Sequence, residues 1–305
     1  MLWLIPFLTL AGCEGRSSQP STSQPQPLKV VTTILPMYLF TKAVVGDAAA
    51  VVLLIPPGSE VHEYQSKPAD VQELAQADVL VRNGLGLEEF LAGTVRSAQN
   101  PNLVEITASQ GIKPLDSANV VHDHSPSSTD PDQADQGNPH IWLDPVRAQE
   151  QVKNIRDGLI KADPAQGQIY ETNAAAYIQK LQQLDQQFQQ QLQACKTDPC
   201  RFIILHDAFP YLANRYHLQQ VAIVEIPEDS FSPRDIQRVI TLAKRSKVKA
   251  LFKEPGVDSQ ALTNLSSDLN LKLETLDPLE SGDLNPQYYF TAMEKNLQTL
   301  KRAFE

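Results

Sequence analysis

The chain has 305 residues, 42% of them hydrophobic, which is long enough for two globular domains with cores of their own. Its 26 basic and 36 acidic side chains give a formal net charge of −10. This balance argues against a nucleic-acid partner, because phosphate binding needs a basic surface. An acidic surface instead suits the attraction of a cation.

The N-terminal segment has the pattern of an exported lipoprotein. A short apolar run at 2–11 ends in Leu10-Ala11-Gly12-Cys13, which resembles a bacterial lipoprotein signal with Cys13 as the lipidated residue. Residues 14–27 are rich in Ser, Gln and Pro, as in a flexible tether. The run has no basic residue and contains Pro6, so a frayed hydrophobic end is the alternative. We expect residues 1–27 to be a signal and tether that place the protein outside the cytoplasm, in the periplasm, anchored to the membrane.

Short strands and helices alternate in the first half of the mature chain. Apolar, β-branched runs at 28–33, 51–55, 77–82 and 103–107 are separated by helical patterns, which predicts a parallel sheet flanked by helices. A Pro-Pro-Gly turn after the second run leads to His62. Because ligands bind where the strands of such sheets end, His62 is a candidate ligand, and Glu60 could approach whatever His62 holds. A solvent-exposed loop histidine is the alternative interpretation.

A polar segment at 117–137 separates this half from the next motif. It carries His122 and His124 among Ser, Pro and Asp, so it is either a loop that captures a divalent cation weakly or a solvated linker. Asn138-Pro139-His140-Ile141-Trp142-Leu143-Asp144-Pro145 follows. Asp144 and Pro145 predict a helix start, with Asp as N-cap and Pro at the first helical position. His140 is then either a packed core histidine or a ligand.

A long helix is predicted in the middle of the chain. Tyr177, Leu181, Leu184, Phe188 and Leu192 recur at spacings of four and three and form one apolar stripe on a helix that ends near Lys196. About thirty residues would span roughly 45 Å. We expect this helix to lie along two lobes.

The second half repeats the alternation of strands and helices. Strand-like runs lie at 201–205, 221–226, 249–253 and 271–276, and three of them are followed directly by His206-Asp207, Glu254 or Asp277. Cys195 and Cys200 are the remaining cysteines, and outside the cytoplasm they would form a disulfide that closes a short loop, with free thiols as the alternative. Three imidazoles and one carboxylate make a four-coordinate set typical of zinc.

These motifs, in order, resemble the substrate-binding lipoproteins of bacterial ABC importers for zinc and manganese. The resemblance rests on the segments from Pro57-Gly58 to His62-Glu63-Tyr64, Asn83-Gly84-Leu85-Gly86-Leu87-Glu88, 140–145, His206-Asp207-Ala208-Phe209 with Tyr216, Lys253-Glu254-Pro255 and Leu276-Asp277-Pro278-Leu279. It implies two lobes, each a parallel β-sheet flanked by helices, joined by one long rigid helix. It also implies that His62, His140, His206 and Asp277 bind the metal, two from each lobe.

The resemblance also bears on the choice of metal and on the supporting residues. Zinc members of the family tend to carry His at the third ligand position and manganese members Glu, so His206 favours Zn²⁺ over Mn²⁺. Asp144 and Asp207 could accept the second ring N–H of a ligand histidine, although Asp144 could equally be a helix cap only. Glu254 and Glu60 are the reserve carboxylates if Asp277 lies too far away.

We therefore expect a monomeric, non-enzymatic receptor that takes up Zn²⁺ between its lobes and delivers it to an ABC transporter permease. The expected divisions are a signal and tether (1–27), an N-terminal lobe (28–145), a linking helical region (146–197) and a C-terminal lobe (198–305). A manganese receptor of the same family is one alternative. A zinc-dependent hydrolase is another, but the chain has no H-E-x-x-H helix. A third is a surface protein with a purely structural metal.

Overall fold

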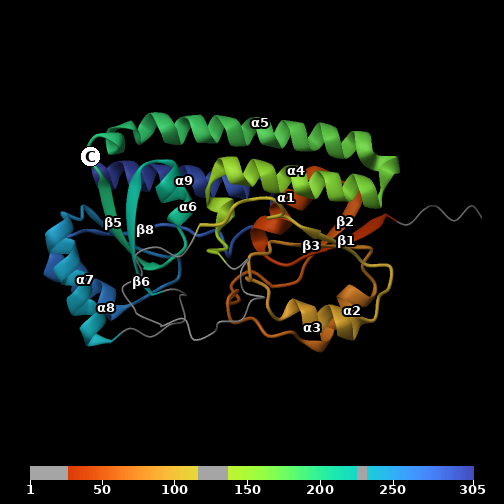
Figure 1. The fold of residues 1–305 in the computed structure, drawn as a ribbon, viewed down its shortest axis with the longest axis horizontal. Coiled ribbons are helices and arrows are strands. Elements are labelled where there is room, and N and C mark those ends of the chain that lie inside the picture. The colour runs from red at the N-terminus through yellow and green to blue at the C-terminus, as the bar shows by residue number, and fades with distance from the viewer. Residues whose placement is uncertain (1–26, 116–136, 225–231) are drawn as a thin grey trace, which may run out of the picture.

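The computed structural model describes residues 27–115, 137–224 and 232–305. The expected lipidation site Cys13, and His122 and His124, lie outside these residues. Figure 1 shows two lobes arranged along the long axis of the molecule, with one long helix running across both on one side.

The N-terminal lobe is built on a parallel sheet with the strand order β2-β1-β3-β4. Val30 and Val31 of the inner strand β1 are fully buried, because helices cover both faces of a parallel sheet. Val31 pairs with Val52 on one side and with Leu80 on the other. The elements of this lobe are β1 (Leu28–Thr32), α1 (Leu35–Val45), β2 (Ala49–Leu53), α2 (Pro68–Ala75), β3 (Val79–Arg82), α3 (Leu91–Ala98) and β4 (Val104–Thr107).

The C-terminal lobe repeats this topology. Its sheet has the order β6-β5-β7-β8. In both sheets, the strand that comes second in the sequence lies at the edge, next to the strand that comes first. Helix α7 begins with a capping box, in which the Ser232 and Asp235 side chains bond reciprocally to each other's backbone N–H. The elements are β5 (Cys200–His206), α6 (Pro210–Arg215), β6 (Leu218–Val224), α7 (Pro233–Ser246), β7 (Ala250–Lys253), α8 (Gln260–Leu269) and β8 (Leu273–Thr275).

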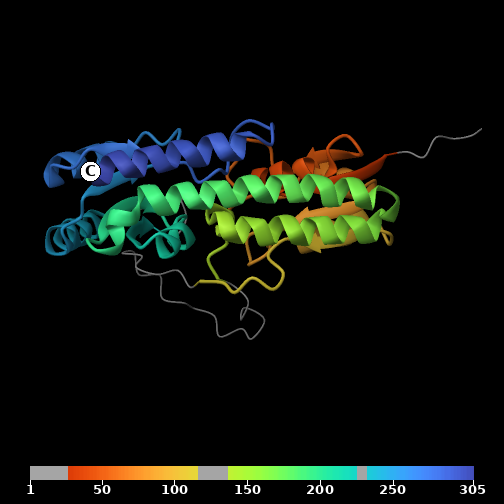
Figure 2. The ribbon, with the colours of Figure 1, turned by 90° about the horizontal axis from the view of Figure 1, so that it is seen from above.

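Three long helices form a layer on one side of the lobes: α4 (Pro145–Ala162), α5 (Gly167–Gln191) and α9 (Tyr288–Phe304). Of these, α5 runs across both lobes (Figure 1). Figure 2 shows α5 lying lengthwise with α4 and α9 on its two sides. Its 25 residues make a helix of about 37 Å. Three short 3₁₀ helices flank this layer: η2 (Ile141–Leu143), η3 (Pro164–Gln166) and η4 (Gln193–Lys196).

One hydrophobic core lies under these helices and reaches both sheets. It contains Val30 and Val79 from the first sheet, Phe202 and Phe252 from the second, and the predicted stripe on α5, whose Leu181 is fully buried. The two α/β lobes with a long joining helix are therefore confirmed. Within the described residues, no helix is both long enough and apolar enough to span a bilayer.

Several predicted boundaries shift for identifiable reasons. The long helix stops at Gln191 rather than near Lys196, because the chain tightens into η4 before the Cys195–Cys200 disulfide. That disulfide is present, with 5.1 Å between the Cα atoms. The strand expected at 221–226 begins earlier, at Leu218, because the backbone pairing with β5 starts there, with Leu218 opposite Cys200.

Candidate metal centre

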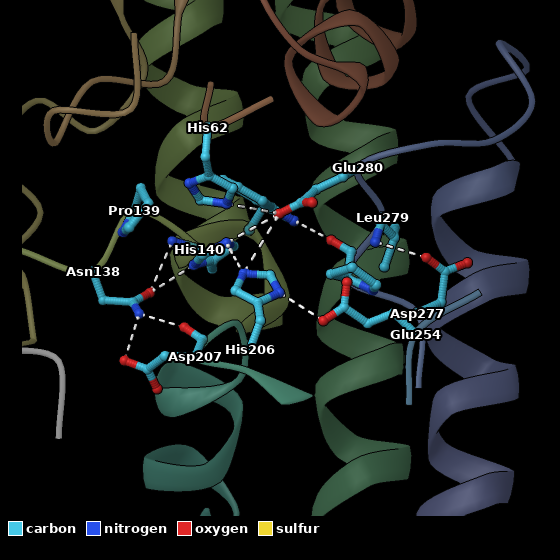
Figure 3. Close-up of polar contacts among 12 residues, drawn as sticks. His62, Asn138, Pro139, His140, His206, Asp207, Glu254, Asp277, Leu279 and Glu280 are labelled. Atoms are coloured by element: carbon cyan, nitrogen blue, oxygen red, sulfur yellow. Dashed lines mark hydrogen bonds and ion pairs between the residues drawn. The ribbon is translucent and has the colours of Figure 1, made fainter. Parts of the chain in front are cut away.

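Three histidines and one glutamate converge between the lobes. His62, His140, His206 and Glu280 each offer one ligand atom, and these four atoms all lie within 4.8 Å of one another. His140 Nε2 is 3.1 Å from both Glu280 Oε1 and His206 Nε2, and His62 Nε2 is 3.4 Å from Glu280 Oε1. Figure 3 shows the three rings and the Glu280 carboxylate pointing toward a common centre.

The loop after β2 carries His62. Val61 next to it is buried, and the Tyr64 hydroxyl donates a hydrogen bond of 2.9 Å to Asp70, which fixes the loop on the start of α2. His62 Nε2 is buried, and although Glu280 Oε1 lies 3.4 Å away, no atom of the described residues is placed to form a well-aligned hydrogen bond with it. A buried ring nitrogen without a partner costs free energy unless something else binds it. Glu60 is exposed and lies outside the group of four.

His140 precedes the short helix η2 and is 1% exposed. Its backbone N–H and its Nδ1 both contact Asn138 Oδ1, at 3.1 and 3.0 Å. The pKa of His140 is lowered to about 3, above all because burial disfavours the charged ring. His140 is therefore a neutral imidazole at physiological pH, which is the form that binds metals.

His206 ends β5 and is fully buried. Its Nδ1 is 2.6 Å from Glu254 Oε1, so the other nitrogen, Nε2, faces the centre of the group. Burial alone would lower the pKa of His206, but the charges of Glu254 and Glu280 and the hydrogen bond with Glu254 raise it to about 9. Without a metal, His206 thus holds a proton at neutral pH. A bound cation would replace that proton on Nε2.

Glu280 takes the position that the sequence assigned to Asp277. Burial would raise the pKa of Glu280, but its contacts with His140 and His62 and the charge of His206 hold that pKa well below the usual range. The carboxylate is therefore ionised beside three ring nitrogens. A carboxylate and imidazoles that face each other this closely form a suitable cage for a cation.

Asp277, the predicted fourth ligand, lies outside this group of four side chains. Its Oδ1 accepts a hydrogen bond of 2.8 Å from the Leu279 N–H, and its Oδ2 accepts one of 2.9 Å from the Tyr288 hydroxyl. The same carboxylate thus caps the turn that presents Glu280, three residues later. Leu279 has a positive φ of 61°, and this turns the chain so that Glu280 points inward (Figure 3).

The supporting residues are only partly those expected, since Asp144 takes the capping role that the sequence also allowed. Asp144 caps α4 at the Val146 N–H and accepts from Arg215, both through Oδ1, so it is a structural cap. Asp207 accepts hydrogen bonds from Asn138 and Gln220 instead of from a ligand histidine. The partners of the histidines are Glu254, expected only as a reserve ligand, and Asn138, which the sequence did not single out.

The geometry of the group fits a small tetrahedral cation. Zn²⁺ with bonds of about 2.0–2.1 Å to nitrogen and oxygen separates its ligand atoms by about 3.3 Å. The distances from Glu280 Oε1 to Nε2 of His140, His62 and His206 are 3.1, 3.4 and 4.0 Å, which bracket this value. A set of three nitrogens and one oxygen suits zinc and does not suit Mg²⁺ or Ca²⁺, which prefer oxygen throughout.

Fold and site together define a class: a two-lobed α/β protein with a candidate metal-binding group between its lobes. The chain belongs to the family described as zinc-uptake complex component A, periplasmic, whose model matches residues 30–303. It is 35% identical to the high-affinity zinc uptake system protein ZnuA of Bacillus subtilis (strain 168), over 97% of this chain and 93% of that protein.

Solved structures agree with this assignment. The Zn(II)-bound ZnuA-like domain of Streptococcus pneumoniae AdcA is 33% identical and has a TM-score of 0.74, with 91% of this chain and 98% of that chain covered. The substrate-binding protein FpvC of Pseudomonas aeruginosa with Ni²⁺ is 28% identical, with a TM-score of 0.79 and coverage of 92% and 97%. This chain spans 55% of the length of the curated S. pneumoniae AdcA.

Sequence reasoning missed two members of the site, Glu280 and Asn138. The register of the sheet could have identified a third, Glu254, as a partner of His206. Ile204 pairs with Phe252 across β5 and β7, so two residues further on His206 stands beside Glu254. The spacing of strand ends therefore contained that signal, whereas Glu280 depends on a turn that no residue pattern indicated.

Proposed function

We propose that this protein is an extracytoplasmic receptor that binds Zn²⁺ with His62, His140, His206 and Glu280 and delivers it to the permease of an ABC transporter. The observation that carries the proposal is the convergence of four ligand atoms within 4.8 Å, two from each lobe. Family membership and the zinc-uptake function of the related B. subtilis protein support the transport role. The lipid anchor on Cys13 and the monomeric state belong to the same proposal.

The charges of the group support a transported ion with a charge of +2. His140 is neutral, His206 carries an exchangeable proton, and Glu280 is ionised. Zn²⁺ would displace one proton and meet one carboxylate in the group, with Glu254 behind His206. The site therefore holds the ion without a buried, uncompensated charge.

The decisive experiment is isothermal titration calorimetry of metal-free protein with Zn²⁺, for the wild type and for His140→Ala and His206→Ala. Tight zinc binding releases about 10–16 kcal/mol in structural sites, so one of four ligands contributes roughly 3 kcal/mol. We expect each variant to bind zinc at least about 100-fold more weakly. Wild-type affinity in both variants would remove the ligand assignment.

Metal choice is tested by competition among Zn²⁺, Mn²⁺ and Ni²⁺. The relatives of known structure include FpvC with Ni²⁺ and with Mn²⁺, so the fold itself does not fix the ion. A set of three imidazoles and one carboxylate favours Zn²⁺ and Ni²⁺ over the harder Mn²⁺. We expect Mn²⁺ to be displaced by equimolar Zn²⁺. Retention of Mn²⁺ would favour the manganese receptor.

The hydrolase alternative has less support. A catalytic zinc keeps one coordination position for water, with a general base beside it. Here four protein atoms offer four ligands, and the nearby Glu254 contacts the outer nitrogen of His206. Exchangeable water on the bound metal, seen by paramagnetic relaxation after substitution with Co²⁺, would favour the hydrolase.

A further inference from the structure

Asn138 contacts the outer side of the His140 ring and is itself 4% exposed. Its Oδ1 accepts a hydrogen bond from the His140 backbone N–H at 3.1 Å and lies 3.0 Å from His140 Nδ1. An amide oxygen only accepts hydrogen bonds, so the contact with Nδ1 needs a proton on that nitrogen. Glu280 Oε1 lies 3.1 Å from His140 Nε2 and competes for the same proton in the metal-free site. The orientation of the Asn138 amide therefore favours the Nδ1–H tautomer, which is the one that leaves Nε2 free to bind a metal.

Asp207 fixes the orientation of this amide. The Asn138 Nδ2 group donates to the Asp207 backbone carbonyl at 2.6 Å and lies 3.1 Å from its carboxylate Oδ2. Both partners are acceptors, so the NH₂ end of the amide must face Asp207 and the oxygen must face His140. The other carboxylate oxygen of Asp207 accepts from Gln220 at 2.5 Å, and Asp207 is fully buried.

This arrangement connects the two lobes at the level of the ligands. Asn138 precedes His140 by two residues, and Asp207 directly follows His206 on the other lobe. Figure 3 shows Asn138 between the His140 ring and Asp207. The Tyr211 hydroxyl of α6 also donates to the Asn138 carbonyl, at 2.5 Å. The segment before His140 is thus held by the lobe that carries His206.

We propose that Asn138 is a positioning residue for zinc binding: oriented by Asp207, it selects the Nδ1–H tautomer of His140 and so leaves the Nε2 lone pair facing the metal. The inference rests on the proposed zinc-binding function. It assigns to a neutral amide in one lobe the role that the Glu254 carboxylate has beside His206 in the other. Partners of this kind typically contribute 10–100-fold to metal affinity.

The test uses complementary changes at the Asn138–Asp207 contact. Asn138→Ala removes the acceptor for Nδ1–H, and we expect zinc affinity to fall about 10–100-fold. Asn138→Asp puts a carboxylate oxygen at the position of Nδ2, which lies 3.1 Å from Asp207 Oδ2. The two carboxylates repel each other, and we expect a loss of zinc affinity at least as large as in Asn138→Ala. The double variant Asn138→Asp with Asp207→Asn restores a donor at the side-chain contact, although a carboxylate oxygen then faces the backbone carbonyl of residue 207, which in the wild type accepts from Nδ2 at 2.6 Å. It should bind zinc more tightly than Asn138→Asp alone, but less tightly than the wild type.

A spectroscopic readout separates positioning from a loss of folding. Long-range ¹H–¹⁵N spectra of the metal-free protein report which ring nitrogen of each histidine is protonated. The wild type and the double variant should show the Nδ1–H form of His140, and Asn138→Ala should show a mixture. Asn154→Ala is the matched control, because Asn154 also donates to two backbone carbonyls, those of Ala108 and Gln110, in the N-terminal lobe.

The outcomes are distinct. Wild-type zinc affinity together with an unchanged Nδ1–H signal in Asn138→Ala would overturn the proposal, as would a double variant no better than Asn138→Asp. If Asn138→Ala does not fold, the double variant decides, because its side chains keep their size. Failure of the wild type to bind zinc would contradict the proposed function instead. The tautomer of His140 in the metal-free protein would then still test the role of Asn138.

Discussion

The two lobes share one topology but contribute different chemistry to the site. Each sheet is parallel and has the same strand order, and each lobe offers two ligand atoms. The N-terminal side supplies His62 and His140, and the partner of His140 is a neutral amide. The C-terminal side supplies Glu280 and also His206, which is backed by the Glu254 carboxylate.

This difference separates geometry from charge. The outer nitrogen of His140 contacts a neutral amide, and His140 stays neutral, with its pKa lowered to about 3 by burial. The C-terminal ligands carry the negative charge that a dication needs, and the same charge keeps a proton on His206. We therefore expect changes in the C-terminal lobe to alter both affinity and pH dependence, and changes in the N-terminal lobe to alter affinity alone.

The largest effect should come from the C-terminal carboxylate itself. Glu280→Gln keeps the shape of the side chain but removes its charge, and we expect zinc affinity to fall at least about 100-fold. Asp277→Asn is the matched control three residues away. It should change zinc affinity less than about tenfold while destabilising the fold by about 1–2 kcal/mol, because Asp277 accepts from Leu279 and Tyr288. Titration calorimetry and thermal unfolding measure both, and the reverse order of effects would reinstate Asp277 as the ligand.

A smaller effect is expected behind the ligand. Glu254→Gln leaves a hydrogen-bond acceptor for Nδ1 of His206. It removes the negative charge that makes Nε2 of the same ring a stronger ligand for the metal. We expect a 10–100-fold loss of zinc affinity, as for other outer partners of metal-binding histidines. Competition with a chelator of known affinity measures this loss. An unchanged affinity would mean that the charge of Glu254 has no part in metal binding.

The pH dependence should also originate in the C-terminal lobe. The pKa of His206 is raised to about 9, so the metal-free site holds a proton at lower pH, and zinc must displace it. Zinc affinity should therefore rise about tenfold per pH unit up to pH 9 and level off above it. His140, with its pKa near 3, adds no proton competition above about pH 4.

Calorimetry in two buffers of different ionisation enthalpy tests this linkage. At pH 7.5 we expect about one proton to be released per zinc bound, and Glu254→Gln should lower that number. Release of no proton in the wild type would contradict the raised pKa of His206.

The smallest effect on zinc affinity is expected from removal of the disulfide, which is present only in the C-terminal lobe among the described residues. Cys195–Cys200 closes a short loop between α5 and β5 in the C-terminal lobe, away from the four ligands. Replacing both cysteines by alanine should lower the free energy of unfolding by about 2 kcal/mol and leave zinc affinity unchanged. Chemical denaturation and zinc titration of the same variant check the two halves of this expectation.

Most of the fold could be predicted because its signals are local. β-branched runs, the cap at Asp144 and the stripe on α5 each depend on neighbouring residues, and each is present in the structure. The three histidines were found because they lie at strand ends or helix starts. Glu280 was missed because its direction depends on Leu279 at a positive φ, which leucine rarely adopts.

The supporting contacts were missed for a related reason. Asp144 and Asp207 are near the histidines in sequence, but hydrogen bonds follow distance in space. Glu254 reaches His206 from the neighbouring strand, and Asn138 reaches His140 because Asp207 orients its amide. Such partners depend on which residues of neighbouring strands stand side by side and on where the chain of one lobe contacts the other. Neither can be predicted from the sequence alone.

The continuous core beneath α5 limits how the protein can signal that it carries an ion. Since side chains from both sheets pack into that core, we expect loaded and empty forms to have nearly the same outline. The exchange of one proton for a dication still changes the local charge by roughly one positive unit. A membrane partner would then distinguish the two forms by electrostatics and by the loops around His62 and Glu280, rather than by the angle between the halves.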